Sequence, residues 1–359
     1  MLAETLARIG PLDRVAMAAA QSRLDALTKP RGSLGRLEAL AVQLAGISRR
    51  PLPSVEKRAA YVFVADHGVT AEGVSAYPSE VTGQMLANFL AGGAAINVLA
   101  RQARAKLVVV DVGVSAEVPE HPQLLSRKVA RGTRNFVYTP AMTREHAVAA
   151  IEAGIASFEP CQLAAVGEMG IGNTTSAAAI VAAAIGAPAC DVTGRGTGID
   201  DAIFARKIAV IDKALALHRA DPSDGLSLLS AVGGFEIGAM AGAMLAAAAA
   251  RVPVVIDGFI STAAAIVASR LCADMVPYLI ASHVSTEPGH RPALAHLGLR
   301  PLLDLDLRLG EGTGAVLSFG LIDAACRLIH EMATFDEARV AERFDEPRRT
   351  NVGIHDGRL

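Results

Sequence analysis

The sequence predicts an α/β fold built on a mainly parallel sheet with helices on both faces. Short apolar runs alternate along the chain with longer alanine-rich segments. Such alternation is typical of crossover units, which place consecutive strands parallel in one sheet. The runs are continuously apolar, as in strands that are covered on both faces. The expected strands lie at 61–65, 107–110, 163–166, 252–256 and 278–281.

Helical segments are expected at both ends of the chain. Apolar residues recur at helical spacing before residue 50, and a second helical pattern runs over 315–330. The charged tail at 331–359 is expected to hold a surface helix and a loose end. We therefore expect a large α/β domain over residues 51–325. Residues 1–50 and 326–359 are expected to pack together as a small helical domain.

The composition restricts the possible partners. Hydrophobic residues make up 52% of the 359 residues and charged residues 19%, less than the usual quarter or so. An unusual share of the surface is therefore expected to be hidden in a large core or a subunit interface. The formal net charge is −2, aromatic residues make up 4%, and no long basic run is present. These features disfavour nucleic acid as a partner, because neither a phosphate-binding stripe nor stacking platforms are visible.

The cellular compartment is inferred from cysteines and apolar segments. The four cysteines lie far apart without a CxxC pair, which indicates reduced thiols in a cytoplasmic protein. The first residues lack the apolar core of a signal peptide. The most apolar stretch, 237–250, is too short to span a membrane. Gly234, Gly238 and Gly242 recur at every fourth position there, a spacing that favours close helix packing in a soluble core.

Polar residues and glycines directly follow the expected strands. Ligands bind outside the carboxyl ends of the strands in open α/β sheets. The residues after these strands should therefore meet at one cleft, whose edge we expect to carry Asp66, Glu168, Asp257 and Ser285.

Two glutamates lie among glycines where an apolar run ends and a helical segment begins. They are Glu168, in 167–175, and Glu311, in 310–314. Glycines let backbone N–H groups approach an anion, and the following helix N-terminus favours negative charge. A carboxylate would repel a phosphate, so we expect these two to face the reacting centre as a base or beside a developing cation. The pattern predicts an enzyme that binds a phosphorylated small molecule.

Other segments carry weaker signals. Residues 194–198 precede a helical stretch with Arg206 and Lys207 and form a second candidate phosphate loop, although an ordinary loop is the alternative. Asp66 and His67 are either an acid–base pair or a structural pair that orients the neighbouring loop. The histidines show no metal-binding spacing, and no GxSxG elbow or Walker lysine is present, so neither a catalytic metal nor a serine nucleophile is expected.

Taken in order, several of these segments resemble the nicotinate-nucleotide–dimethylbenzimidazole phosphoribosyltransferase family of cobalamin lower-ligand synthesis. The resemblance covers nearly the whole chain. The matching segments are 29–35, 65–69, 73–78 with Gln84, 167–175, 194–198, 257–259, 282–285 and 309–314.

The resemblance implies a function and a fold. The phosphoribosyl group of nicotinate mononucleotide would pass to dimethylbenzimidazole, giving α-ribazole 5'-phosphate and nicotinate with inversion at the anomeric carbon. The family fold is a Rossmann-like, mainly parallel sheet with a small helical domain formed by both chain ends. A homodimer without cofactor or metal is implied.

The resemblance also implies roles for individual residues. Glu311 would be the general base that takes the acceptor's proton, and Glu168 would orient the acceptor or stabilise positive charge on the ribose. The wall of the benzimidazole slot would comprise Ser75, Tyr77, Pro78, Gln84, Met169 and Leu309. Phosphate and ribose would be bound by Gly170, Gly196, Lys207, Asp257, Gly258, Ser285 and Arg308.

Two other functions stay open at this point. Water could replace the aromatic acceptor, which would make the protein a nicotinate mononucleotide hydrolase, or the chain could be a non-catalytic nucleotide-binding module. Among acceptors, benzimidazoles, purines and phenolics all suit an apolar slot.

Overall fold

A computed structural model describes residues 1–196 and 198–341. Thr197 in the second candidate phosphate loop, and the expected loose end at 342–359, lie outside the described residues.

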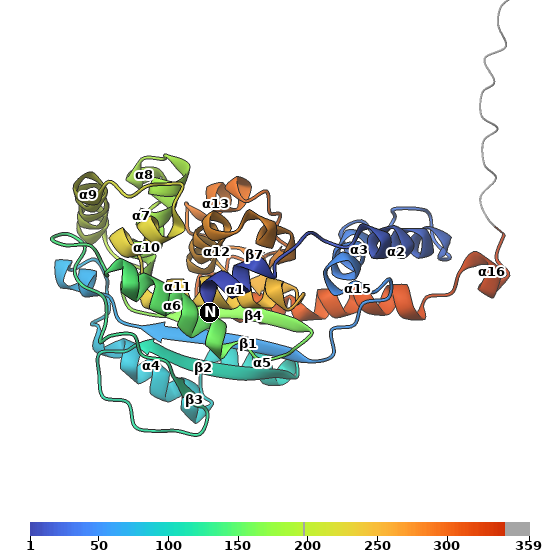
Figure 1. The fold of residues 1–359 in the computed structure, drawn as a ribbon, viewed down its shortest axis with the longest axis horizontal. Coiled ribbons are helices and arrows are strands. Elements are labelled where there is room, and N and C mark those ends of the chain that lie inside the picture. The colour runs from blue at the N-terminus through green and yellow to red at the C-terminus, as the bar shows by residue number, and fades with distance from the viewer. Residues whose placement is uncertain (197, 342–359) are drawn as a thin grey trace, which may run out of the picture.

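The centre of the fold is a six-stranded parallel sheet with the order β3-β2-β1-β4-β5-β6. Strands β1 to β4 are labelled in Figure 1. The five expected strands are confirmed, whereas β3 comes from a segment without a sequence signal. Two short strands, β7 and β8, form a separate parallel pair. The strands are β1 Arg58–Ala65, β2 Ala105–Gly113, β3 Leu124–Ser126, β4 Leu163–Met169, β5 Val254–Ile256, β6 Leu279–Ala281, β7 His283–Val284 and β8 Leu303–Asp304.

The strand order places a crevice beside β1 and β4. From β1 the chain proceeds outward to β2 and β3, and it then returns to the other side of β1 to form β4, β5 and β6. The strand order therefore reverses between β1 and β4, and in open α/β sheets ligands bind at such a reversal, outside the carboxyl ends of the strands. Glu168 lies near the end of β4, paired in register with Phe63 of β1.

Helices cover both faces of the sheet. In β1, Tyr61 and Phe63 face one apolar cluster, whereas Val62 and Val64 face the other. Helices α6, α7, α10, α11 and α12 pack on the first face, and α4, α5 and α14 on the second, where α3 and α15 extend the second apolar cluster beyond the sheet. The helices so far named are α3 Arg36–Ser48, α4 Glu80–Ala91, α5 Ala95–Gln102, α6 Arg144–Ser157, α7 Asn173–Ile185, α10 Gly225–Val232, α11 Phe235–Ala249, α12 Phe259–Leu271, α14 Thr313–Leu317 and α15 Phe319–Glu331.

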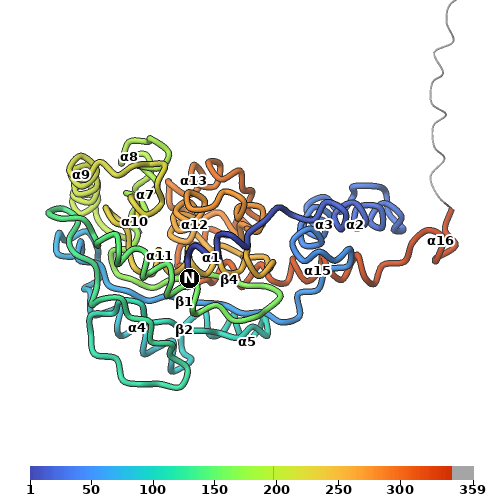
Figure 2. Tube along the Cα trace, viewed as in Figure 1, coloured from blue at the N-terminus to red at the C-terminus, as the bar shows by residue number. Residues whose placement is uncertain are grey.

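The chain ends contribute to two places. Helices α2 and α3 pack together and against α15, away from the sheet (Figure 2), and Leu27 pairs with Thr334. Helix α1 instead contacts α6 and α11, and the Leu2 N–H donates to Glu152 Oε1 at 2.9 Å. The division of the chain into two domains stays a prediction. The remaining helices are α1 Leu2–Ala7, α2 Arg14–Ala26, α8 Ala189–Val192, α9 Asp201–His218, α13 His290–His296 and α16 Phe335–Ala338, with 3-10 turns at Gly68–Glu72 and Ala273–Tyr278.

Two segments of the described chain are long and apolar enough to cross a membrane, Glu80–Gln102 and Thr313–Glu331. Within the protein, 33% and 56% of their respective windows are buried. Core helices of soluble proteins meet the same criteria, so these segments are weak evidence for a membrane span.

Helices α6 and α11 cross at glycines. A methyl group on Gly154 would collide with the backbone carbonyl of Ala239, and one on Gly242 would collide with the carbonyl of Ile151. The close helix packing expected for Gly242 is therefore confirmed.

We expect Gly154→Ala to destabilise the fold by about 1–3 kcal/mol, because the added methyl group must push two packed helices apart. Gly320 in α15 is a matched control, since a methyl group there meets no atom within 4 Å. Alanine at 320 should stabilise the chain by about 0.5–1 kcal/mol through its better helix propensity. Chemical unfolding measures both variants, and equal stability of the two would contradict this account of the helix crossing.

Candidate active site

A cavity of about 670 Å³ opens at the carboxyl ends of the strands. Its wall combines the loop after β1, the end of β4, the start of α7, the loop before α9 and the segment 306–311. Of the residues expected at the site, those in the wall are Ser75, Tyr77, Glu168, Met169, Gly170, Gly196, Lys207, Gly258, Ser285, Arg308, Leu309 and Glu311. Sequence segments separated by more than 200 residues thus meet at one cavity.

Glu311 lies in an unusual turn. Its φ is 63°, and the flanking Gly310 and Gly312 have φ values of 88° and 86°. Glycine adopts this left-handed conformation at little cost, so the two glycines limit the strain to Glu311 itself. The turn lies tightly against β4, because a methyl group on Gly167 would collide with the backbone of Glu311 and Gly312.

The Glu311 carboxylate is buried and directed at a helix start. Its Oε2 accepts a hydrogen bond from the Ile96 N–H, in the first turn of α5, at 3.3 Å. Burial raises the pKa of Glu311, and the Ile96 hydrogen bond opposes that rise. Helix N-termini favour the charged form of a carboxylate, so this contact offsets part of the effect of burial while Glu311 stays more basic than an exposed glutamate.

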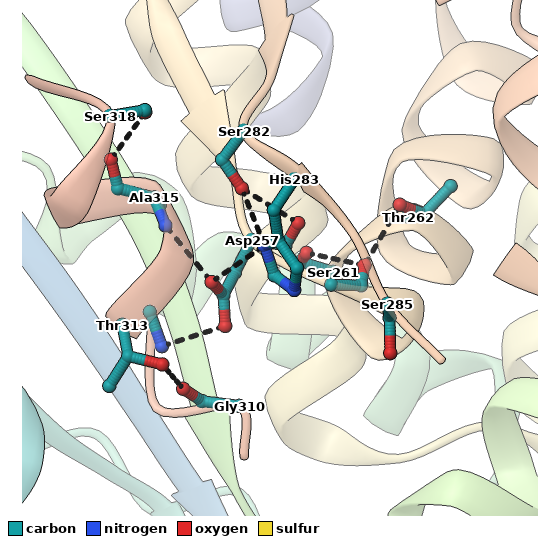
Figure 3. Close-up of polar contacts among 12 residues, drawn as sticks. Asp257, Ser261, Thr262, Ser282, His283, Ser285, Gly310, Thr313, Ala315 and Ser318 are labelled. Atoms are coloured by element: carbon teal, nitrogen blue, oxygen red, sulfur yellow. Dashed lines mark hydrogen bonds and ion pairs between the residues drawn. The ribbon is translucent and has the colours of Figure 1, made fainter. Parts of the chain in front are cut away.

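Asp257 accepts hydrogen bonds from the backbone that follows Glu311. Its Oδ2 accepts from the Gly312 N–H at 3.1 Å, and its Oδ1 accepts from the Ala315 N–H at 3.0 Å (Figure 3). Burial raises the pKa of Asp257 to about 7, against the effect of these backbone donors. Asp257 is absent from the cavity wall, and its contacts give it a part in positioning the turn.

Glu168 is the second carboxyl group of the cavity. It is 6% exposed, and the side-chain amide of Asn173 donates to its Oε2. A methyl group on Gly310 would collide with the Glu168 carboxyl, so the two glutamate segments are in direct contact. Burial, with the negative charges of Glu236 and Asp257 adding to it, raises the pKa of Glu168 to about 8. Glu168 is therefore mostly protonated at neutral pH when the cavity is empty.

One end of the cavity offers hydrogen-bond donors. The Lys207 ammonium donates to Thr174 Oγ1 at 2.9 Å and to the Gly194 carbonyl at 3.1 Å. Burial lowers the pKa of Lys207 to about 8, and the negative charge of Glu287 opposes that change. The same part of the wall contains the N-terminus of α7, where the helix dipole favours an anion.

Glu287 and Arg308 complete this end. Glu287 Oε1 accepts from the Gly196 N–H at 2.9 Å, while its other oxygen is buried without a hydrogen-bond partner in the described chain. Arg308 Nη1 donates to the Gly196 carbonyl at 3.4 Å. These contacts fix the conformation of the loop at Gly196 between two segments of opposite charge.

Another part of the wall is apolar. Tyr77 and Leu309 are 52% and 59% exposed, and Met169 lies nearby in the same wall, together with Val74, Val81 and Met85. Ser75 Oγ accepts from the Tyr77 N–H at 3.2 Å, which shapes the loop. Pro78 does not line the cavity, and Gln84 lines a different one.

This second cavity, of about 930 Å³, lies between α4 and the loop after β2. Asp66 lines it, with Oδ2 accepting from the Ser115 N–H at 2.7 Å. The expectation of a single cleft is therefore wrong, because the chain after β1 turns Asp66 away from Glu168 and Ser285.

His67 points into the core. Its Nε2 lies 2.7 Å from Glu236 Oε1, and its Nδ1 lies 3.0 Å from Ser176 Oγ. The ring is also in contact with the glycine turn of the cavity, because a methyl group on Gly170 would lie 3.3 Å from it. Of the two interpretations of Asp66 and His67, these contacts favour the structural one.

Several polar residues of the cavity wall had no site role assigned from the sequence: Asn173, Arg195, His283 and Glu287. Asn173 and His283 lie inside segments with a sequence signal, whereas nothing in the sequence distinguishes Glu287 from other surface acids. Within 1–196 and 198–341, no group of three or more His, Cys, Asp or Glu side chains could hold a metal ion.

The chain is similar to proteins of known name. A family model described as phosphoribosyltransferase matches residues 9–340. The nicotinate-nucleotide–dimethylbenzimidazole phosphoribosyltransferase of Roseiflexus sp. (strain RS-1) is 59% identical over 350 residues, covering 96% of this chain and 99% of that protein. The protein of the same name from Geobacter metallireducens is 54% identical over 351 residues, with the same coverage of both chains. The crystal structure of the enzyme of this name from Thermus thermophilus superposes with a TM-score of 0.88 at 48% identity, covering 92% of this chain and 100% of that one.

Proposed function

The chain belongs to the nicotinate-nucleotide–dimethylbenzimidazole phosphoribosyltransferase family, and we propose that it transfers phosphoribose from nicotinate mononucleotide to dimethylbenzimidazole. The products are α-ribazole 5'-phosphate and nicotinate. One observation carries this proposal: the wall of a single cavity contains the hydrogen-bond donors around Lys207, the apolar side chains of Tyr77 and Leu309, and two buried carboxyl groups.

In this proposal the donor phosphate binds at Lys207, Gly170, Gly196, Ser285 and Arg308, beside the N-terminus of α7. The apolar wall then accommodates the flat acceptor ring. The reacting carbon lies between these ends, beside Glu168 and Glu311.

The reaction requires one base. The pyridine nitrogen of the donor is already quaternised, so nicotinate leaves with a neutral ring nitrogen and takes up no proton. The unprotonated nitrogen of dimethylbenzimidazole attacks the anomeric carbon as the bond to nicotinate breaks, which inverts that carbon from β to α. The other benzimidazole nitrogen loses its proton, and a carboxylate within reach can accept it.

The two carboxyl groups are suited to different roles, because their surroundings affect their pKa values differently. Glu311 receives a backbone hydrogen bond at a helix start, which favours the ionised form that a base requires. Glu168 is fully buried near other acids and holds its proton to about pH 8. We assign proton abstraction to Glu311, and to Glu168 the orientation of the acceptor and the stabilisation of positive charge.

We expect donor binding to release a proton from Glu168 near pH 7. With a pKa of about 8, Glu168 is mostly protonated in the empty cavity. The pyridinium ring brings positive charge, which favours the carboxylate and lowers this pKa. Calorimetry in buffers of different ionisation enthalpy measures the proton count, and Glu168→Gln should remove the release. An unchanged count in the variant would contradict this role for Glu168.

The proposed function is tested by incubating the protein with nicotinate mononucleotide, with and without dimethylbenzimidazole. We expect nicotinate release that depends on the acceptor, with formation of α-ribazole 5'-phosphate. Release without acceptor would instead indicate a hydrolase, and no release would indicate a nucleotide-binding module. A panel of benzimidazoles, purines and phenolics then defines the preferred acceptor.

We also propose that the enzyme is a cytoplasmic homodimer that needs no cofactor or metal and binds neither nucleic acid nor membrane. The high apolar content, 52% of the chain, supports a buried subunit interface. Size-exclusion chromatography with light scattering tests the dimer.

A further inference from the structure

His283 is a residue of the cavity wall to which the proposed reaction assigns no role. It begins β7 directly after β6, and its side chain is 3% exposed. Gly258 and Ser285, which the family resemblance assigns to phosphate and ribose binding, are its neighbours in the wall. On the other side the ring packs on α14, since a methyl group on Gly314 would collide with it. His283 thus lies between Gly258 and helix α14, which follows the Glu311 turn.

The hydrogen bonds around His283 fix which nitrogen carries its proton. The Ser282 hydroxyl donates to the backbone carbonyl of Asp257 at 3.0 Å, and this uses its only hydrogen (Figure 3). The contact of 3.0 Å between Ser282 Oγ and His283 Nδ1 therefore requires Nδ1 to be the donor. Asp257 Oδ1, 3.8 Å from Nδ1, favours a proton at the same place.

It follows that Nε2 carries a free lone pair. Burial lowers the pKa of His283 to about 4, so the ring is neutral near pH 7. Within 1–196 and 198–341, no protein group forms a hydrogen bond with Nε2. A methyl group on Gly258 would lie 3.5 Å from Nε2, so this edge of the ring faces the Gly258 side of the wall. By contrast, His290 uses both ring nitrogens, with Ser285 N and Thr262 Oγ1.

His283 lines the cavity, so an acceptor nitrogen there that has no protein partner can take a hydrogen bond from a donor on the ligand. Between the phosphate and the reacting carbon, nicotinate mononucleotide offers the two ribose hydroxyls as donors. We propose that His283 Nε2 accepts a hydrogen bond from a ribose hydroxyl of the phosphoribosyl donor. This inference rests on the proposed function, and it makes His283 a binding residue that fixes the orientation of the ribose.

Two variants of His283 distinguish the contributions of its two ring nitrogens to donor binding. Asparagine places an amide near the Nδ1 position and can still donate to Ser282, but it has no acceptor at the Nε2 position. Glutamine is longer and can present its oxygen there. We expect His283→Asn to weaken binding of nicotinate mononucleotide by about 3- to 30-fold, the usual effect of losing one such hydrogen bond. His283→Gln should retain most of the affinity, and dimethylbenzimidazole binding should change in neither.

Deoxy donors identify the hydroxyl. Calorimetry compares nicotinate mononucleotide with its 2'-deoxy and 3'-deoxy forms on wild type and His283→Asn. The wild type should bind one of the two deoxy forms more weakly than nicotinate mononucleotide, by the same factor by which His283→Asn weakens binding of nicotinate mononucleotide. The variant should bind that deoxy form and nicotinate mononucleotide with equal affinity. The inference would be overturned if His283→Asn lowered the affinity for all three donors by the same factor, or if it lowered only the affinity for dimethylbenzimidazole.

A measurement on the wild type needs no variant. Nitrogen-15 NMR of the histidines should show an unprotonated Nε2 in His283 that shifts toward the protonated value when the donor binds. A protonated Nε2, or one that donor binding leaves unchanged, would overturn the inference. These binding measurements do not depend on turnover. If the wild type binds the donor but transfers nothing, the proposed function is wrong, and the role of His283 in donor binding can still be tested.

Discussion

Glu311→Gln is expected to lower turnover by about 10²–10⁴-fold, the usual contribution of general base catalysis, while both substrates still bind. Glutamine keeps the size of the side chain, and its amide oxygen can accept the hydrogen bond from Ile96. It cannot accept the benzimidazole proton. Single-turnover release of nicotinate measures the rate, and calorimetry measures binding of each substrate.

Two controls separate base catalysis from a disturbed site. Glu168→Gln should reduce the rate less, because Glu168 does not take the proton in this mechanism. An N-methylated benzimidazole has no proton to lose, so any transfer to it should be equally fast in wild type and Glu311→Gln. Near-normal turnover of Glu311→Gln across a panel of acceptors would move the role of base to Glu168 or to solvent.

Lys207→Ala is expected to weaken binding of nicotinate mononucleotide by about 10- to 150-fold, which corresponds to about 1.5–3 kcal/mol for a hydrogen bond to a charged group. Dimethylbenzimidazole should bind as before, because the proposal places its ring against the apolar residues of the wall, whereas the Lys207 ammonium contacts Thr174 and Gly194. Calorimetry with each ligand measures both affinities.

Two further variants, Lys207→Met and Arg206→Ala, test whether the loss of affinity comes from the ammonium group of Lys207. Methionine approximately preserves the volume and removes the ammonium group with its charge and its hydrogen-bond donors, so its effect should match that of alanine. Arg206 is the adjacent cation on α9, but it donates to Gly73 and is absent from the cavity wall. Its loss should leave donor affinity almost unchanged. Equal effects of Lys207→Ala on both ligands, or none on either, would contradict the phosphate assignment.

The sheet was predictable because its strands are encoded locally. Strands covered on both faces must be continuously apolar, and all five expected runs form strands. By contrast, β3 at Leu124–Ser126 is short and only partly buried, so its residues carry no such pattern. The attachment of α1 to α6 and α11 depends on contacts 150 residues apart in the chain, such as Leu2 with Glu152, which no local pattern reveals.

The glycine-flanked glutamates were predictable as a pair for a similar reason. The turns around Glu168 and Glu311 need glycines for close approach and left-handed backbone, and such needs are visible in sequence. Whether a polar residue after a strand faces the ligand is decided by loop conformation. Asp257 turns both oxygens to α14, Asp66 faces the second cavity, and His283 lines the active-site cavity.

The central claim is that Glu311 takes the acceptor's proton, and the pH dependence of the chemical step tests it most directly. Burial raises the pKa of Glu311, and only its ionised form is active, so the wild-type rate should increase with pH through that pKa and then level off. The measurement is single-turnover nicotinate release from bound nicotinate mononucleotide and dimethylbenzimidazole, for wild type and Glu311→Gln. The account predicts a rising limb in the wild type and a flat, slow profile in the variant. Parallel rising limbs in both proteins would contradict it.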